Sequence, residues 1–208
     1  MKDFSIGSRL SNADLIGINK CFSPVEKTYK RGEIITICSS DNDTIGIIAS
    51  GTAYLSTNNN EDQRRILNYY ETGDIFGMHF IPQSESKAFY IIAKTNCTII
   101  CIKYKNFITC CKNSCDKHNS YIDSLIMLSV KKHLMHIDIL SQRSLRSKLI
   151  SFFEYLKTEK NKSTFILPLP LADLADYLAV DRSAMMREIK NLNDECIIKS
   201  DKRRITIL

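Results

Sequence analysis

Glycine divides this chain of 208 residues into two parts of different character. None of its seven glycines follows Gly77, and five of them lie between Gly32 and Gly77. Glycine gathers where strands turn or bulge, and it is costly inside helices. The distribution therefore predicts a β-rich first part and a second part that is free to form helices.

Short, β-branched apolar segments lie between these glycines at a steady spacing. Turn-forming runs separate them, such as Asn58-Asn59-Asn60 and Glu71-Thr72-Gly73-Asp74. Such a series is typical of a β-sandwich or barrel, which we assign to residues 1–117. The segments expected to be strands are 34–37, 45–49, 54–57, 66–70, 89–93 and 98–103.

Beyond Lys105 the apolar residues follow a helical period. A long helix is expected over 120–142, because this stretch holds neither glycine nor proline. Apolar residues alternate along it at spacings of four and three, which is a heptad seam interrupted by one lysine. We predict that this connecting helix, assigned to 118–142, pairs two copies of the chain; the alternative is that the same face packs on the barrel. The seam consists of Tyr121, Leu125, Leu128, Lys132, Met135 and Ile139.

The segment after this helix reads as one amphipathic helix over 143–159 and then two short helices. The run LPLADLADYLAVDRSAMMREIKNL (169–192) has the spacing of two helices joined by a tight turn, with Asp181 as a cap of the second. The inner face of that second helix holds Met185, Ile189 and Leu192. A short anchored helix with arginines outside is what reading of the DNA major groove requires. The outer face of the second predicted helix carries Arg182, Ser183, Met186, Arg187 and Lys190.

A basic hairpin is expected at the end of the sequence. Two β-branched runs, Ile197-Ile198 and Ile205-Thr206-Ile207-Leu208, flank the turn, where Lys202 and Arg203 are expected to contact phosphate. Residues 141–208 hold 13 Lys and Arg against 9 Asp and Glu, which is +4 of the net +6 of the chain. We therefore predict a winged helix-turn-helix over 143–208 that binds double-stranded DNA.

Composition and motifs argue against several other classes. No run approaches the ~18 apolar residues of a membrane span, and residues 1–11 lack an apolar signal core, so we expect a cytoplasmic chain. No Ser-His-Asp order, phosphate-cradling glycine loop or paired-histidine zinc motif is visible, so we do not expect an enzyme. The eight cysteines follow no secreted disulfide framework and are expected to be thiols.

Three cysteines and one histidine, which are soft metal ligands, lie close together between residues 110 and 118. Cys111, Cys115 and His118 would face one way on a helix, with Cys110 beside them, and this suits a soft metal. The paired Cys-x-x-Cys pattern of structural sites is missing, and free cysteine often packs as a small apolar residue. We assign no metal or cofactor, and keep as the alternative function a ligand-binding or metal- or redox-sensing barrel with little DNA binding.

The predicted order of β-barrel, long helix and winged helix resembles the Crp/Fnr family of bacterial transcription regulators. The matching segments are 29–35, 48–53, 73–77 and 174–187, so that the resemblance covers almost the whole chain. It implies an α+β fold with an N-terminal cyclic-nucleotide-binding-type jelly roll, a long dimerisation helix and a C-terminal winged helix-turn-helix. It also implies a homodimer that binds DNA, with RNA polymerase as a further partner and a small effector held by the barrel.

The resemblance assigns roles to individual residues. Arg182, Ser183 and Arg187 would read bases, with Arg182 pairing with guanine, whereas Lys190 would contact phosphate. Many family members have Glu in place of Ser183, which implies a different operator. They often have Gly in place of Ala179, and if that residue needs a positive φ, alanine costs ~1 kcal/mol.

The resemblance also locates an effector pocket, in which three polar groups are replaced. Met78 stands in place of a ribose-binding carboxylate, Lys87 in place of a phosphate-binding arginine, and Ala88 in place of a serine. Lys87 keeps a charge but not the planar fork that pairs with phosphate. We therefore predict no tight binding of cyclic AMP and an unidentified small molecule as the effector, with His79 in its pocket.

Overall fold

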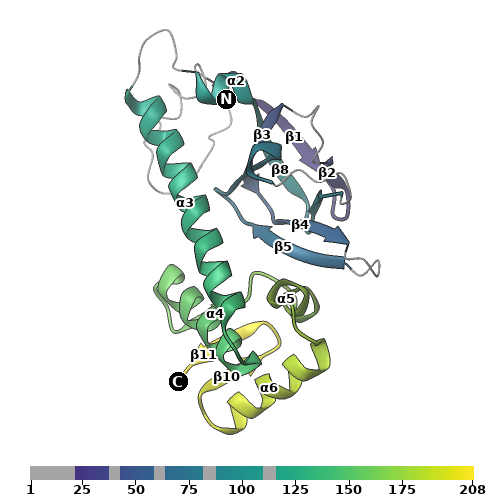
Figure 1. Cartoon of the computed structure of the whole chain (residues 1–208), viewed down its shortest axis with the longest axis vertical. Helices are drawn as coiled ribbons and strands as arrows, with labels where there is room; N and C mark the ends of the chain where they lie inside the picture. Colours follow the sequence, from purple (N-terminus) through teal and green to yellow (C-terminus); the bar gives the residue numbers. More distant parts are fainter. Residues whose placement is uncertain (1–21, 38–42, 59–63, 82–87, 110–115) are drawn as a thin grey trace. The chain divides into compact units, whose positions relative to one another are not determined.

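The computed structural model describes residues 22–37, 43–58, 64–81, 88–109 and 116–208 (Figure 1). The chain divides into two compact units, Met1–Gln63 with Leu67–Val130 and Arg64–Ile66 with Lys131–Leu208. None of the helices in the described ranges combines the length and the apolar character needed to cross a membrane.

The first unit is built on two four-stranded sheets, with strand orders β1-β8-β3-β6 and β2-β7-β4-β5. All six strands expected from the sequence are present, whereas β1 and β6 had not been predicted. The predicted jelly-roll barrel is thereby confirmed. The strands are β1 (Val25–Tyr29), β2 (Ile34–Ile37), β3 (Thr44–Ser50), β4 (Ala53–Asn58), β5 (Arg64–Tyr70), β6 (Ile75–Gly77), β7 (Tyr90–Ala93) and β8 (Cys97–Lys103).

Two glycines allow close approach around strand β3 within the sheet β1-β8-β3-β6. Gly51 adopts φ +89°, and a Cβ at this position would lie 2.3 Å from the carbonyl oxygen of Asn96. Gly46 in β3 lies opposite Phe76 in β6, and its Cβ would lie 2.2 Å from the Phe76 ring. Any larger residue would force the backbone or the ring to move, which explains why glycine marks this part of the sequence.

Side chains alternate between two cores across the sheet β1-β8-β3-β6. Ile48 and Ile99 face the other sheet, where they pack with Leu55 and Ile91. Their neighbours Ile47 and Ile100 point to the opposite face of the sheet. This period of two is the ordinary geometry of a strand, and here both faces are buried. The second core is covered by helices α2 (Tyr104–Ile108) and α3 (Asp116–Ser141).

The face of α3 that the sequence analysis assigned to a dimer seam is partly buried inside the chain. Tyr121 and Leu125 belong to the second core of the barrel, as the alternative interpretation required, and each is 5% exposed. Ile139 is buried in the second unit, while Lys132 and Met135 are half-buried. An interface with a second copy needs exposed residues, so the burial of Tyr121, Leu125 and Ile139 within the chain argues against these three as seam residues. For Lys132 and Met135 the seam stays a prediction. Of the six, Leu128 is exposed.

The buried hydroxyl of Tyr121 leads to a stability prediction. It has no hydrogen-bond partner in the described part of the chain, and burial raises the pKa of Tyr121 to about 12. Leaving a buried hydroxyl unpaired costs about 1–3 kcal/mol, so we expect Tyr121→Phe to raise the free energy of unfolding by about 1 kcal/mol at pH 8. Urea unfolding of both proteins measures the difference.

The difference in the free energy of unfolding between the parent protein and Tyr121→Phe should also depend on pH. An unfolded tyrosine ionises near pH 10, so that between about pH 10 and pH 12 the unfolded state binds fewer protons than the folded state. The stability of the parent protein should then fall by up to ~1.4 kcal/mol per pH unit through this window, and the Phe variant lacks this loss. A Phe variant that is less stable at pH 8 would mean that the hydroxyl has a partner.

The second unit contains the last part of α3, three further helices and a three-stranded sheet of order β10-β11-β9. Ser144 caps α4, and Leu149, Phe152, Phe153 and Leu156 of this helix are buried. The elements are α4 (Leu145–Lys160), β9 (Thr164–Ile166), α5 (Leu171–Leu178), α6 (Arg182–Asp194), β10 (Ile198–Asp201) and β11 (Arg204–Ile207).

The end of α3 is anchored on α5 by an aromatic contact. The buried ring of His136 stacks on Tyr177, with centroids 3.7 Å apart and planes 7° from parallel. Nε2 of His136 lies 3.0 Å from the carbonyl oxygen of Tyr177. The long helix is thus fixed to the first of the two short helices within this unit.

Candidate nucleic-acid interface

The two short helices α5 and α6 are joined by a turn of three residues, as the sequence predicts. Leu174, Ala175 and Leu178 are buried on α5. Asp181 caps α6, because its Oδ1 accepts a hydrogen bond from the backbone N–H of Ala184 at 2.7 Å. Between them, Ala179 adopts the left-handed conformation with φ 51° and ψ 52°. The positive φ considered from the sequence is therefore confirmed.

This conformation makes Ala179→Gly a stabilising substitution. The Ala179 side chain is exposed, so glycine loses little packing and removes the clash of Cβ with the backbone. We expect the free energy of unfolding to rise by about 0.5–1 kcal/mol, measured by urea unfolding. The matched control is Ala175→Gly, inside α5, which should lose about 1 kcal/mol. A less stable Ala179→Gly protein would contradict the account of this turn.

Helix α6 buries one side and exposes the other. Met185, Ile189 and Leu192 are buried, with exposures of 0%, 5% and 0%. The polar and basic side chains of the helix lie on the opposite side, in agreement with the sequence pattern, and Met186 among them is 42% exposed. The exposed face of α6 consists of Arg182, Ser183, Met186, Arg187 and Lys190. A helix with one anchored side and cations on the other has the form that fits a major groove.

The predicted hairpin is formed by β10 and β11, with Ile198 opposite Ile207 and Asp201 opposite Arg204. Its turn holds Lys202, which is exposed with φ 53°. Nε of Arg203 donates to the carbonyl oxygen of Leu167 at 3.0 Å, and Nη2 donates to the same oxygen. The guanidinium of Arg203 thus has a partner inside the chain. Arg204, which the sequence analysis did not single out, is a further exposed cation of the hairpin.

Asn193 connects the hairpin to α6. Its Oδ1 accepts from the backbone N–H of Ser200 at 2.7 Å, and its Nδ2 donates to Ser200 Oγ at 2.6 Å and to the Ile189 carbonyl at 2.8 Å. The sequence gives no sign of this role, because an asparagine near a helix end is also an ordinary helix-terminal residue. The contacts hold the cationic turn and the exposed face of α6 in one unit.

The predicted effector pocket is only partly within the described residues. Lys87 and the side chain of Met78 lie outside them, and Ala88 is exposed, with its carbonyl oxygen accepting from Thr57 Oγ1 at 3.0 Å. The ring of His79 stacks on Tyr104 with centroids 3.5 Å apart, and its Nε2 lies 3.4 Å from Asp43 Oδ1. These contacts give His79 partners within the first unit.

The proposed soft-metal group also lies outside the described side chains. Cys110, Cys111 and Cys115 are not described, and the side chain of His118 is not described either. Elsewhere in the described ranges, no three His, Cys, Asp or Glu residues are arranged to hold a metal ion.

The comparisons agree with this architecture. Residues 26–114 match the model of the cyclic nucleotide-binding domain family. No curated protein sequence matches this chain.

Solved structures with the same fold match 88% or more of this chain. A cyclic nucleotide-binding domain containing protein from Listeria monocytogenes has a TM-score of 0.76 at 14% identity, over 94% of this chain and 96% of that one. FixK2 from Bradyrhizobium japonicum has a TM-score of 0.66 at 15% identity, over 88% of this chain and 92% of that one. A putative transcriptional regulator of the Crp/Fnr family from Eubacterium rectale has a TM-score of 0.59 at 17% identity, over 99% of this chain and 94% of that one. The chain therefore carries a β-barrel of the cyclic nucleotide-binding type and has the fold of the Crp/Fnr transcription regulators.

Proposed function

We propose that this chain is a dimeric, sequence-specific DNA-binding transcription regulator whose effector is not cyclic AMP. Helix α6 would enter the major groove, and the turn of the hairpin would contact the phosphates beside it. The observation that carries this proposal is the exposed face of α6, which presents Arg182, Arg187 and Lys190 from a helix whose other side is buried. The fold shared with transcription regulators supports it.

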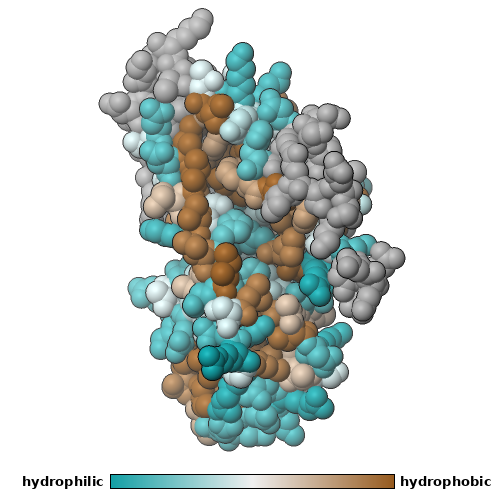
Figure 2. All heavy atoms as spheres, in the orientation of Figure 1, coloured by the Kyte–Doolittle hydropathy of each residue, from teal (hydrophilic) through white to brown (hydrophobic). Residues whose placement is uncertain are grey.

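A dimer is supported by an apolar stripe on α3. Met127, Val130, Leu134 and Ile137 are spaced by three, four and three residues, so that they share one side of the helix. Each is 46% to 62% exposed, and Figure 2 shows hydrophobic side chains along the line of α3. This heptad spacing fits a parallel copy of the same helix. The apolar stripe lies on the side of α3 that is opposite Tyr121 and Leu125.

The barrel is proposed to sense a molecule other than cyclic AMP. The replacement of a carboxylate, an arginine and a serine by Met78, Lys87 and Ala88 removes the polar groups by which a cyclic nucleotide would be held. Titration calorimetry should show no binding of cyclic AMP at micromolar concentration, and a micromolar dissociation constant would overturn this part of the proposal.

The salt dependence of DNA binding tests the role of the hairpin. Lys202→Ala should weaken binding to all sequences similarly and reduce the slope of log K against log salt by about 2 for the dimer, because each of the two copies releases about one counterion fewer. Fluorescence anisotropy of a labelled duplex measures both quantities. Lys162→Ala is the control: it removes the same charge next to β9, at the end of the sheet away from the turn, as the β9–β11 register shows. Equal slopes for both variants would contradict a phosphate contact by Lys202.

A further inference from the structure

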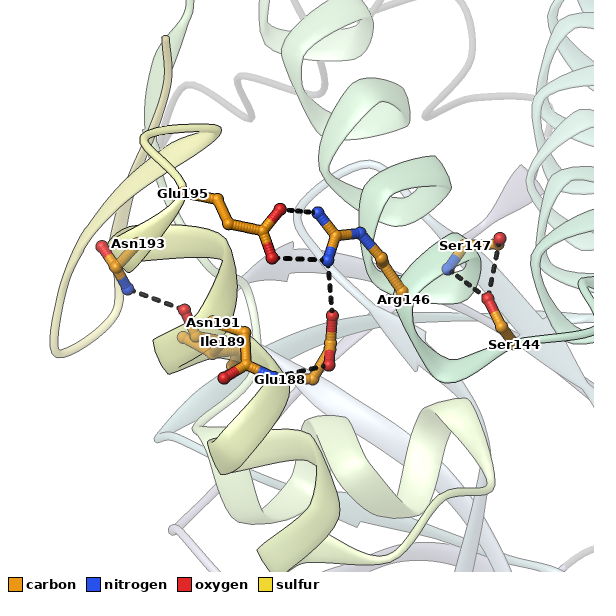
Figure 3. A network of polar contacts seen from close by, with 8 residues as sticks. All are labelled: Ser144, Arg146, Ser147, Glu188, Ile189, Asn191, Asn193 and Glu195. Carbon is orange, nitrogen blue, oxygen red and sulfur yellow. Dashed lines mark hydrogen bonds and ion pairs between the residues drawn. The ribbon is translucent and has the colours of Figure 1, made fainter.

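A network of charged residues connects the start of α4 with one side of α6 (Figure 3). Nη1 of Arg146 donates to Glu195 Oε1 at 2.8 Å and to Glu188 Oε1 at 3.4 Å, and Nη2 donates to Glu195 Oε2. Nδ2 of Asn191 donates to the other oxygen of Glu188 at 3.1 Å. Glu188, Asn191 and Glu195 are three and four residues apart and therefore line one flank of α6.

The two main partners are each poorly placed in their own helix. Arg146 lies in the first turn of α4, where a cation meets the positive end of the helix dipole and no acidic residue is present. Glu195 is the C-cap residue of α6, where an anion meets the negative end and the last turn has no basic residue. Each charge is thus unfavourable for its own helix and is stabilised by the other charge. This indicates that the pair serves the contact between the two helices rather than the stability of either helix.

The geometry of the contact restricts how α6 can lie on α4. Burial of Met185, Ile189 and Leu192 holds α6 on the core, but hydrophobic contacts have little directional preference. A guanidinium that donates two parallel hydrogen bonds to one carboxylate fixes direction as well as distance. The hydrogen bonds from Arg146 also lower the pKa of Glu195.

We propose that Arg146 is a positioning residue for DNA reading, which fixes the orientation of the exposed face of α6 by holding Glu188 and Glu195. This inference rests on the proposed function. The side chains of Arg146 and Glu195 are 37% and 49% exposed, and exposed ion pairs contribute little to stability. The consequence of losing the contact should therefore appear in the discrimination between DNA sequences rather than in the stability of the fold.

The test compares the dissociation constants of the full chain for its selected operator and for a random duplex of equal length. For Arg146→Met, we expect the operator constant to rise by about 10-fold or more and the random constant by less than about 3-fold, because base contacts need alignment and phosphate contacts do not. Arg143→Met is the matched control: it removes the same charge from an exposed arginine that precedes α4. It should leave the ratio of the two constants unchanged.

A charge exchange separates positioning from the loss of an arginine. In a Glu188→Gln background, Arg146→Glu alone should lower the ratio of the random-duplex dissociation constant to the operator constant, and Arg146→Glu with Glu195→Arg should restore this ratio. The circular dichroism spectrum confirms that each variant is folded. An unchanged ratio in folded Arg146→Met, or no rescue by the exchange, would overturn the inference. A parent protein without any sequence preference would instead overturn the proposed function.

Discussion

Leu134→Glu is expected to convert the proposed dimer into monomers and to reduce operator affinity by at least about 100-fold, because the gain from binding two half-sites together is lost. Leu134 is 60% exposed in the single chain, so the fold should tolerate the carboxylate. In a paired helix the same carboxylate would be buried without a partner, which is strongly unfavourable. Analytical ultracentrifugation measures the assembly, and fluorescence anisotropy measures DNA binding.

A matched variant separates the stripe from the added charge. Thr158→Glu adds the same charge at an exposed position of α4 and should leave both assembly and affinity unchanged. Leu128→Glu tests the original seam prediction, because Leu128 is exposed but lies away from the apolar stripe. A dimer that survives Leu134→Glu and dissociates with Leu128→Glu would place the interface on the side of α3 that holds Leu128. This outcome would contradict an interface on the apolar stripe.

Arg182→Ala is expected to reduce affinity for the operator by about 1–3 kcal/mol, or roughly 5-fold to 150-fold, for each half-site, and to relax the preference at one base position of each half-site. Arg182 is the first residue of α6, and the helix N-terminus is the part that reaches base edges in a helix-turn-helix. Its guanidinium can donate two hydrogen bonds to guanine O6 and N7. Competition binding against operators changed at single positions measures the effect.

Arg182→Lys is the control that isolates the planar fork. It keeps the positive charge, so the salt slope should be retained, but it cannot make the paired contact and should still lose discrimination. If Arg182→Ala binds the same sequences with the same preferences, the assignment of Arg182 to base reading is wrong.

Local patterns predicted the elements of this fold well. Asp181 caps α6 and Ala179 takes the left-handed turn, because both depend on residues within a few positions. Six of the eight barrel strands were found. Strand β1, with the sequence VEKTY, was missed because four of its five residues are exposed and it lacks an apolar pattern, and β6, with the sequence IFG, has only three residues. Strand prediction from sequence depends on burial, and an exposed edge strand gives little signal.

Contacts between distant residues could not be predicted in the same way. Helix α3 carries two apolar faces with similar spacing. The packing of Tyr121 and Leu125 into the core of the barrel shows which of the two faces is buried within the chain. The role of Arg146 depends on Glu195, which is 49 positions away in the sequence. Charges at helix ends that oppose the dipole were the available signal, and they would have singled out Arg146 and Glu195.

In the proposed function, two copies of α6 read DNA from a single dimer. Selection of bound duplexes from a random pool by the full-length protein tests it most directly. We expect enrichment of a two-fold symmetric sequence whose half-sites are about one helical turn, roughly 10 base pairs, apart. Recovery of a random pool, or of a single half-site bound by one chain, would contradict it.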